Sequence, residues 1–420
     1  MLEIIFICSK GMADIEFLAI CDPVAVQEFG HNLAALSRYS KHLERFCNNI
    51  YIYAGASLLS RNIDLDNFFG KFIYHYSHYY SRLIHVPPDR LDKTGRMLLR
   101  LSSQEAHEAA KRSAIAELKR ILDKACNYNR SIIFFPSVDY YSLFALANLS
   151  DEIKNSTCQV LIRFIGVLES SSYCSKEGET FDSIMNILSR ATRDAKENIF
   201  HFSAESPVLA SRFRREYGLN VSVTPTLVDE DPLPDTDSKR FTLAFPGSAR
   251  IDKGYDKILN ILQELDARQP FLDYRVYLQS LPTSELVHHY NIQRDLFKHP
   301  RIRAYPAKVN QDELKNYIQK SHLLILPYCP NIYQERSSAM MAEAACFGRQ
   351  VVASSNCGFS SQIESLGIGQ TCNNAIEMAE AIANYSLLTA DSLKLKAAEA
   401  RISYKNHIVR SYDSFFSFSS

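Results

Sequence analysis

The feature that most constrains this chain is the alternation of short, continuously apolar runs with segments of helical periodicity. Residues 17–21 (FLAIC) form one run and residues 50–53 (IYIY) the next, while Leu36, Tyr39 and Leu43 recur between them at helical spacing. Runs of this length predict strands that are buried on both faces, and the segments between them predict amphipathic helices. Strands and helices that alternate in this way form parallel sheets covered by helices on both sides.

The same alternation continues through the chain and predicts two α/β domains in tandem, which suits a length of 420 residues. The polar segment 229–240 (DEDPLPDTDSKR) carries two prolines and no apolar periodicity, so we expect a linker there. The expected domains are 1–228 and 241–420, each Rossmann-like and doubly wound. A last helix from about Ser392 towards Tyr412 belongs to the second domain or packs back on the first.

Further strands are expected at 132–135, 159–165, 199–203, 241–245, 274–279, 323–326 and 351–354. Two such domains in tandem favour a cleft between them, with ligands bound beyond the carboxyl ends of the strands.

The charges exclude one class of protein. Lys+Arg and Asp+Glu both number 47, so the formal net charge is zero, which argues against a nucleic-acid partner. No run of 18 apolar residues exists, the first ten residues make a poor signal peptide, and Met12 is an alternative start. The ten cysteines include no Cys-x-x-Cys pair, and no Cys/His cluster has zinc-site spacing. These features predict a cytoplasmic protein with reduced thiols and without a metal site.

One tract leaves two interpretations open. Residues 68–80 are rich in Phe and Tyr, and residues 82–130 carry 11 Lys/Arg against 6 Asp/Glu. Aromatic and basic residues together could rest on an anionic membrane surface, which would make the protein peripheral at the inner face of a membrane. The alternative is a set of core aromatics beside a solvated helix face.

The first motif that carries chemistry is the loop after the predicted strand 241–245. Gly247 lets the backbone turn and approach a ligand, and Arg250 and Lys253 are three residues apart in the same loop. Two cations there suit a diphosphate, which Arg can bind in bidentate fashion and Lys as a point charge. The alternative is a pair of solvated surface cations.

The second motif lies between the predicted strands 323–326 and 351–354. Ser337 or Ser338 is a suitable N-cap for a helix that Gly348 would end, and a helix N-terminus is a ready anion site. Glu335 precedes this helix. Glu343 lies within it, among apolar residues, and a buried carboxylate there needs a partner, either a pair of ligand hydroxyls or a Lys or Arg of the protein.

Glu335 and Glu343, separated by seven residues, resemble the Glu-x7-Glu signature of retaining glycosyltransferases of the GT-B fold, most of all glycosyltransferase family 4. The loop with Gly247, Arg250 and Lys253 resembles the phosphate-contacting loop of that family. The resemblance covers about residues 241–400.

The resemblance implies two Rossmann-like domains that face a cleft, a nucleotide-sugar donor in the second domain, and neither metal nor resident cofactor. Arg250 and Lys253 would then hold the diphosphate, and Glu335 would contact hydroxyls of the donor sugar. Glu343 would bind the ribose, and the base would stack near Tyr305. Backbone N–H groups near the helix start would assist, at Ser337, Ser338, Ala339 and Met340.

The first domain offers His31, Asp139 and Arg163 as acceptor-side candidates, each of which could instead be a capping or core residue. The chain departs from the family pattern at Ala339 and Gln350, where members have Gly and Pro, and in the absence of a pocket histidine.

The expected function is a metal-independent hexosyltransferase that acts on a saccharide or lipid-linked acceptor, in surface polysaccharide or glycolipid assembly. The alternative is a catalytically degenerate glycosyltransferase-like binding or scaffold subunit. A two-domain sugar-nucleotide epimerase is less consistent with the residues, because its acid/base groups cannot be placed.

Overall fold

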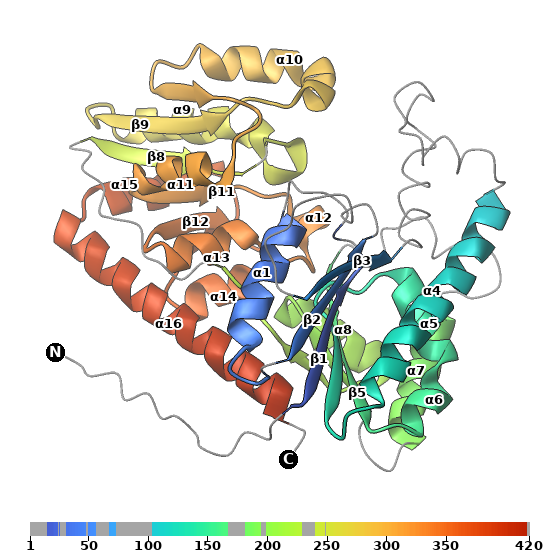
Figure 1. Ribbon diagram of the computed structural model, residues 1–420. Coiled ribbons are helices and arrows are strands. Elements are labelled where there is room, and N and C mark those ends of the chain that lie inside the picture. The colour runs from blue at the N-terminus through green and yellow to red at the C-terminus, as the bar shows by residue number, and fades with distance from the viewer. Residues whose placement is uncertain are drawn as a thin grey trace. The chain divides into compact units, whose positions relative to one another are not determined.

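The computed structural model describes residues 15–23, 25, 31–47, 49–55, 67–72, 103–166, 181–194, 199–228, 240–247 and 249–417. Their contacts form two compact units (Figure 1). The first comprises Met1–Glu205, Ala210–Thr224 and Ser411–Ser420, and the second comprises Ser206–Leu209 and Pro225–Arg410. Each unit is built on one parallel sheet with helices on both faces, which confirms the predicted fold class. The predicted linker lies outside the described residues except for Arg240, so the domain boundaries stay a prediction.

The first unit holds a seven-stranded parallel sheet in the order β3-β2-β1-β4-β5-β6-β7. Continuous burial along β1 agrees with an apolar run that helices cover on both faces. The strands are β1 (Phe17–Asp22), β2 (Ile50–Gly55), β3 (Phe68–Phe72), β4 (Ser131–Phe135), β5 (Cys158–Phe164), β6 (Phe200–Ala204) and β7 (Val221–Val223).

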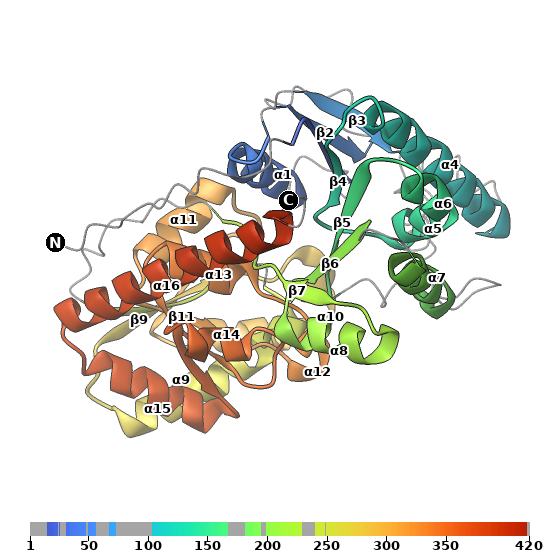
Figure 2. The ribbon, with the colours of Figure 1, turned by 90° about the horizontal axis from the view of Figure 1, so that it is seen from below.

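Helix α1 (His31–Leu43) covers one face of this sheet, and α4 (Ser103–Ala125), α5 (Tyr140–Asn148) and α7 (Phe181–Asp194) cover the other (Figures 1 and 2). The unit also contains α6 (Ser150–Lys154) and most of α8 (Pro207–Tyr217). On α4, Leu118, Ile121, Leu122 and Ala125 are buried.

The described part of the aromatic and basic tract packs within this unit. The ring of Phe69 stacks on that of Tyr53 with 5.4 Å between centroids, and the Lys124 ammonium lies 3.6 Å from the centroid of Tyr51. Residues 73–102 lie outside the described part of the chain. The membrane interpretation therefore stays a prediction. None of the described helices is long and apolar enough to cross a bilayer.

The second unit holds a six-stranded parallel sheet in the order β10-β9-β8-β11-β12-β13. As in the first unit, the chain winds outwards in one direction and then returns to the centre to wind in the other, which is the doubly wound arrangement. The strands are β8 (Phe241–Phe245), β9 (Tyr274–Gln279), β10 (Ile302–Tyr305), β11 (Leu323–Leu326), β12 (Gln350–Ser354) and β13 (Gly369–Cys372).

Helices α9 (Ile258–Arg268) and α15 (Ala375–Ser386) lie on one face of this sheet, and α11 (Gln311–Gln319) and α13 (Ala339–Cys346) on the other (Figure 2). The remaining helices are the 3₁₀ turns η4 (Ile251–Lys253) and η5 (Tyr255–Lys257), α10 (Thr283–Phe297), α12 (Pro330–Tyr333) and α14 (Ser360–Ser365). Leu262, Leu265 and Ile382 belong to the core that joins α9, α15 and the sheet.

The last helix, α16 (Ala390–Phe416), begins slightly earlier and ends slightly later than predicted. Its residues up to Arg410 group with the second unit, where the Tyr404 hydroxyl donates to the carbonyl of Thr226 over 3.1 Å. Its last residues group with the first unit, where Phe416 stacks on Phe46 with 5.1 Å between centroids.

Eight of the ten cysteines lie in the described part of the chain. None of the eight described cysteines forms a disulfide; Cys8 and Cys174 lie outside the described residues.

Two loops meet at Gly254, between η4 and η5. Gly254 has a φ of +76°, and a Cβ built there would lie 1.9 Å from the carbonyl oxygen of Pro327, which follows β11. A hydrogen bond of 2.9 Å from the Cys329 N–H to the Asp252 carbonyl joins the same two loops. Only glycine allows this approach of the two backbones.

We expect Gly254→Ala to lower the free energy of unfolding by about 3 kcal/mol, because it adds a backbone overlap to the strain of a positive φ. Gly367→Ala is the matched control. Gly367 has a φ of +65° with no atom within 4 Å of its Cβ position, so it carries the φ strain alone, about 1 kcal/mol. Chemical denaturation followed by circular dichroism measures the free energy of unfolding of both variants. Equal losses in the two variants would contradict the role given to the close approach.

Candidate donor-binding site

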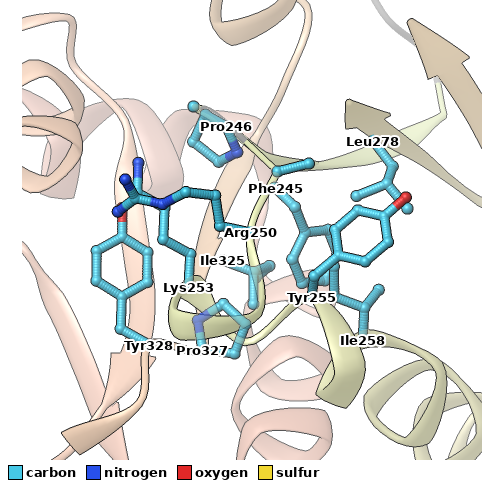
Figure 3. A pocket seen from close by; sticks show the side chains of 12 residues that line it. Phe245, Pro246, Arg250, Lys253, Tyr255, Ile258, Leu278, Ile325, Pro327 and Tyr328 are labelled. Atoms are coloured by element: carbon cyan, nitrogen blue, oxygen red, sulfur yellow. The ribbon is translucent and has the colours of Figure 1, made fainter. Parts of the chain in front are cut away.

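The site lies where the strand order of the second sheet reverses. β8 and β11 are neighbours, and the chain leaves their carboxyl ends towards opposite faces of the sheet, which opens the crevice where doubly wound sheets bind ligands. A pocket there is lined by residues of both loops, among them Pro246, Gly247, Arg250, Lys253, Pro327 and Tyr328. In Figure 3, Arg250 lies on the side of Tyr328, and Tyr255 lies with Leu278 on the opposite side.

The structure brings Gly247, Lys253 and Met340 together. A Cβ built at Gly247, whose φ is +91°, would lie 3.2 Å from the Lys253 Nζ and 3.4 Å from the Met340 Cγ. The phosphate-type loop predicted after β8 therefore lies against the first turn of α13, although the two are about 90 residues apart in the sequence. A backbone that a ligand can approach closely, a cation and a helix N-terminus together are suited to bind an anion.

Opposing effects act on the charge of Lys253. Burial, and then the nearby Arg250, lower the pKa of the Lys253 ammonium to about 8, while Asp252 and Glu343 act in the opposite direction. The ammonium also lies 5.7 Å from the centroid of the Tyr328 ring. Lys253 is therefore a cation that exchanges its proton near neutral pH and gains from an added negative charge.

Arg250 is held by Asp252 and Tyr333, neither of which is among the predicted site residues. Its Nε donates to the Asp252 Oδ1 over 2.9 Å and its Nη2 to the Oδ2 over 2.8 Å, so the carboxylate occupies one bidentate edge of the guanidinium. Nη2 also donates to the hydroxyl of Tyr333 over 3.0 Å. An acidic residue between two cations was a readable signal for Asp252, whereas no sequence signal marks Tyr333.

The N-cap of α13 is Ser338, one of the two serines proposed for it. Its hydroxyl accepts from the N–H of Met341 over 3.2 Å, and the residue is 3% exposed. Ser337 precedes the cap and Ala339 begins the helix. Gly348 follows the helix with a φ of +71°, as predicted for a C-terminal stop.

The two glutamates differ in their surroundings. Glu343 is 1% exposed and is close enough to Lys253 to favour the charged lysine, while its role towards a ligand stays a prediction. Glu335 is half-buried, and its backbone is held from two sides. Its carbonyl accepts from the Ser206 hydroxyl over 2.6 Å, and a Cβ at Gly358 would lie 2.7 Å from its carbonyl carbon.

Tyr305 lies away from this cluster. It ends β10, two strands from β8, which corresponds to about 10 Å across the sheet. The residue is 4% exposed, and its ring stacks on Tyr317 of α11 with 4.0 Å between centroids and 18° between planes. One face of the ring is thus already occupied.

The acceptor-side candidates lie in the first unit. Asp139 caps α5 and accepts from the Ser142 N–H over 2.8 Å. Arg163 is buried and donates to the carbonyls of Thr224 and Pro136, each over 3.2 Å. Both side chains therefore serve the local fold. His31 is the first residue of α1, and its side chain lies outside the described residues.

No family model and no curated protein matches the chain. Solved structures do match it along nearly its whole length. A glycosyltransferase from Rickettsia africae is 14% identical, with a TM-score of 0.60 over 96% of this chain and 98% of that one. A UDP-forming trehalose-phosphate synthase from Burkholderia xenovorans is 13% identical, with a TM-score of 0.61 over 96% and 98%.

Anabaena HepE, solved in complex with UDP, is 12% identical, with a TM-score of 0.57 over 95% of this chain and 99% of that one. Identities of this size show the fold. The chain thus has the two-domain α/β architecture of the GT-B glycosyltransferases, with one doubly wound parallel sheet in each unit.

Proposed function

We propose that the chain is a retaining glycosyltransferase of the family 4 type, which transfers a sugar from a nucleotide-diphosphate sugar to a saccharide or lipid-linked acceptor. One observation carries the proposal. Lys253, Gly247 and the first turn of α13 converge at the switch point of the second sheet, with Arg250 in the same loop. Two cations and a helix N-terminus suit a diphosphate.

In this proposal Arg250 and Lys253 bind the diphosphate, and N–H groups near Ser338 add to their field. These groups stabilise the negative charge that grows on the leaving diphosphate as the glycosidic bond breaks. They do so without a metal ion. Because they are already positioned, little reorganisation is needed during the reaction.

The carboxylates take the remaining roles. Glu335 contacts hydroxyls of the donor sugar, and Glu343 binds the ribose while it supports the charge of Lys253. Retention follows from attack on the same face of the sugar that the diphosphate leaves, with the leaving phosphate accepting the proton of the acceptor hydroxyl. The base binds towards the β9–β10 side of the sheet, where Tyr305 ends its strand.

The similarity to HepE, which was solved with UDP, and to a UDP-forming synthase supports a nucleotide-sugar donor. We place the protein in the cytoplasm, with peripheral membrane contact through the tract that follows β3. Its pathway would be the assembly of a surface polysaccharide or glycolipid.

One departure from the family pattern is accommodated by the fold. Gln350 stands at the start of β12, where family members have Pro. Its amide donates to the Gly367 carbonyl over 3.3 Å, and its oxygen accepts from the Tyr385 hydroxyl over 3.1 Å. A buried glutamine with both ends bonded fits the strand, so this change gives no support to a degenerate subunit.

A thermal-shift screen against a panel of nucleotide sugars tests the donor class. A bound ligand raises the melting temperature by mass action, and a concentration of one hundred times the Kd adds about 2.7 kcal/mol. A single clear hit would name the donor. A chain that binds and hydrolyses none of them would favour the alternative of a noncatalytic binding subunit.

With the donor known, we expect Lys253→Ala to lower kcat/KM at least about 100-fold, because it removes a charge aimed at the leaving group. Glu335→Ala should lower it as well, through lost contacts to the sugar. Lys396→Ala, which removes an exposed lysine of α16 in the same unit, is the control and should leave kcat/KM within about twofold. Steady-state transfer assays give these values. Unchanged transfer in both site variants would refute the proposal.

The pH dependence of binding follows from the lowered pKa of Lys253, about 8 in the unliganded protein. Below this pH the ammonium is charged, and above it the charge is lost. A bound diphosphate favours the charged form and raises the pKa. Affinity should therefore fall as the pH rises through 8, and binding at pH 8 should take up about half a proton.

Calorimetry in buffers of different ionisation enthalpy measures the proton uptake. Lys253→Met should abolish it, because the variant has no titrating group at this position. Proton uptake that persists in Lys253→Met would assign the effect to another group.

A further inference from the structure

Arg250, Asp252 and Tyr333 form a closed set of contacts. Besides the bonds that Arg250 makes to each of the other two, the Tyr333 hydroxyl donates to the Asp252 Oδ2 over 3.4 Å. Arg250 and Asp252 belong to the loop after β8, whereas Tyr333 ends α12 in the loop after β11. The set therefore joins the two loops of the candidate site through their side chains.

These contacts determine which N–H groups of Arg250 can donate a hydrogen bond to a ligand. A guanidinium has five N–H donors, one on Nε and two on each Nη. Asp252 takes the Nε hydrogen and one Nη2 hydrogen, and Tyr333 takes the other Nη2 hydrogen. Nη1 has no hydrogen-bond partner among the described residues, so its two hydrogens are the ones that an anion can receive.

Tyr333 is itself firmly placed. The residue is 6% exposed, and its ring packs on that of Tyr328 with 4.6 Å between centroids. Its N–H donates to the Cys329 carbonyl over 3.0 Å, and its carbonyl accepts from the Gly358 N–H over 2.8 Å. Tyr333 also stands two residues before Glu335. A fixed hydroxyl can hold a flexible side chain in one rotamer.

We propose that Tyr333 is a positioning residue that holds Arg250 with Nη1 directed to an incoming diphosphate, and that it thereby couples the phosphate loop to the segment carrying Glu335. This inference rests on the proposed function. Arg250 is 40% exposed at its side chain, so without an anchor it would sample several rotamers. Ordering it in advance removes an entropy cost that binding would otherwise carry.

Tyr333→Phe tests the role, because it removes the hydroxyl and keeps the ring. With inorganic pyrophosphate as the probe, calorimetry should show binding weakened about fivefold, while the melting temperature stays within about 2 °C of wild type. Tyr274→Phe is the matched control. Like Tyr333, Tyr274 donates its hydroxyl to an aspartate, Asp266, over 2.7 Å and lies next to an arginine, Arg301, which sits over the tyrosine ring. Tyr274 does not line the pocket. It should leave pyrophosphate binding unchanged.

A double-mutant cycle with Arg250→Lys separates positioning from general damage, since lysine has no Nη2 for the hydroxyl to hold. Tyr333→Phe should have no further effect in that background. The same fivefold loss in both backgrounds, or no loss in wild type, overturns the inference and leaves the proposed function standing. A wild-type protein that binds neither pyrophosphate nor any nucleoside diphosphate overturns both.

A spectroscopic signature of Arg250 needs no ligand. The Nε–H resonance of Arg250 is identified by its disappearance in Arg250→Lys, and its bond to Asp252 should keep it visible in wild type. In Tyr333→Phe it should broaden or shift, because the side chain is no longer held. An unchanged resonance means that Asp252 alone orders Arg250 and overturns the role of Tyr333.

Discussion

The candidate site depends on one close approach, that of the Gly254 backbone to the carbonyl of Pro327. The sheet order makes β8 and β11 neighbours, but only a residue without a side chain lets the loops that follow them touch. This contact places Lys253 beside Gly247 and the first turn of α13, and it places Asp252 beside the start of α12. The cations of the first loop and the helix of the second therefore form one site.

The strands and helices that the sequence predicted best are those whose residues are most completely buried. β8 and β11 have the predicted bounds, because runs rich in apolar residues identify central strands. The elements that it missed bury little or lie at edges. β10 exposes its two middle residues, β13 (GQTC) has one buried residue, and α10 has one as well. Periodicity cannot find an element that has no apolar face.

The candidate site shows the same limit at the level of side chains. Gly247, Arg250 and Lys253 could be grouped from spacing, and their place beside α13 follows from the doubly wound order. The contact between Tyr333 and Arg250 could not, because it joins residues 83 apart through the packing of a short helix. Tyr305, which was expected to stack on the base, shows the opposite case, a residue that could be placed from the sequence but whose surroundings could not. Its position at a strand end was readable, but the stacking of Tyr317 on its ring depends on how α11 docks.

Nearby carboxylates oppose both cations of the candidate site. Arg250 and Lys253 repel each other, and burial further weakens the charge of Lys253. Asp252 pairs with the arginine at its Nε/Nη2 edge, and Glu343 acts on the lysine from α13, so the unliganded loop is close to neutral. The cations nevertheless keep donors for a ligand, Nη1 on one side and a titrating ammonium on the other. Such a site suits a ligand of a few negative charges at fixed positions, because it offers directed hydrogen bonds rather than a diffuse positive field.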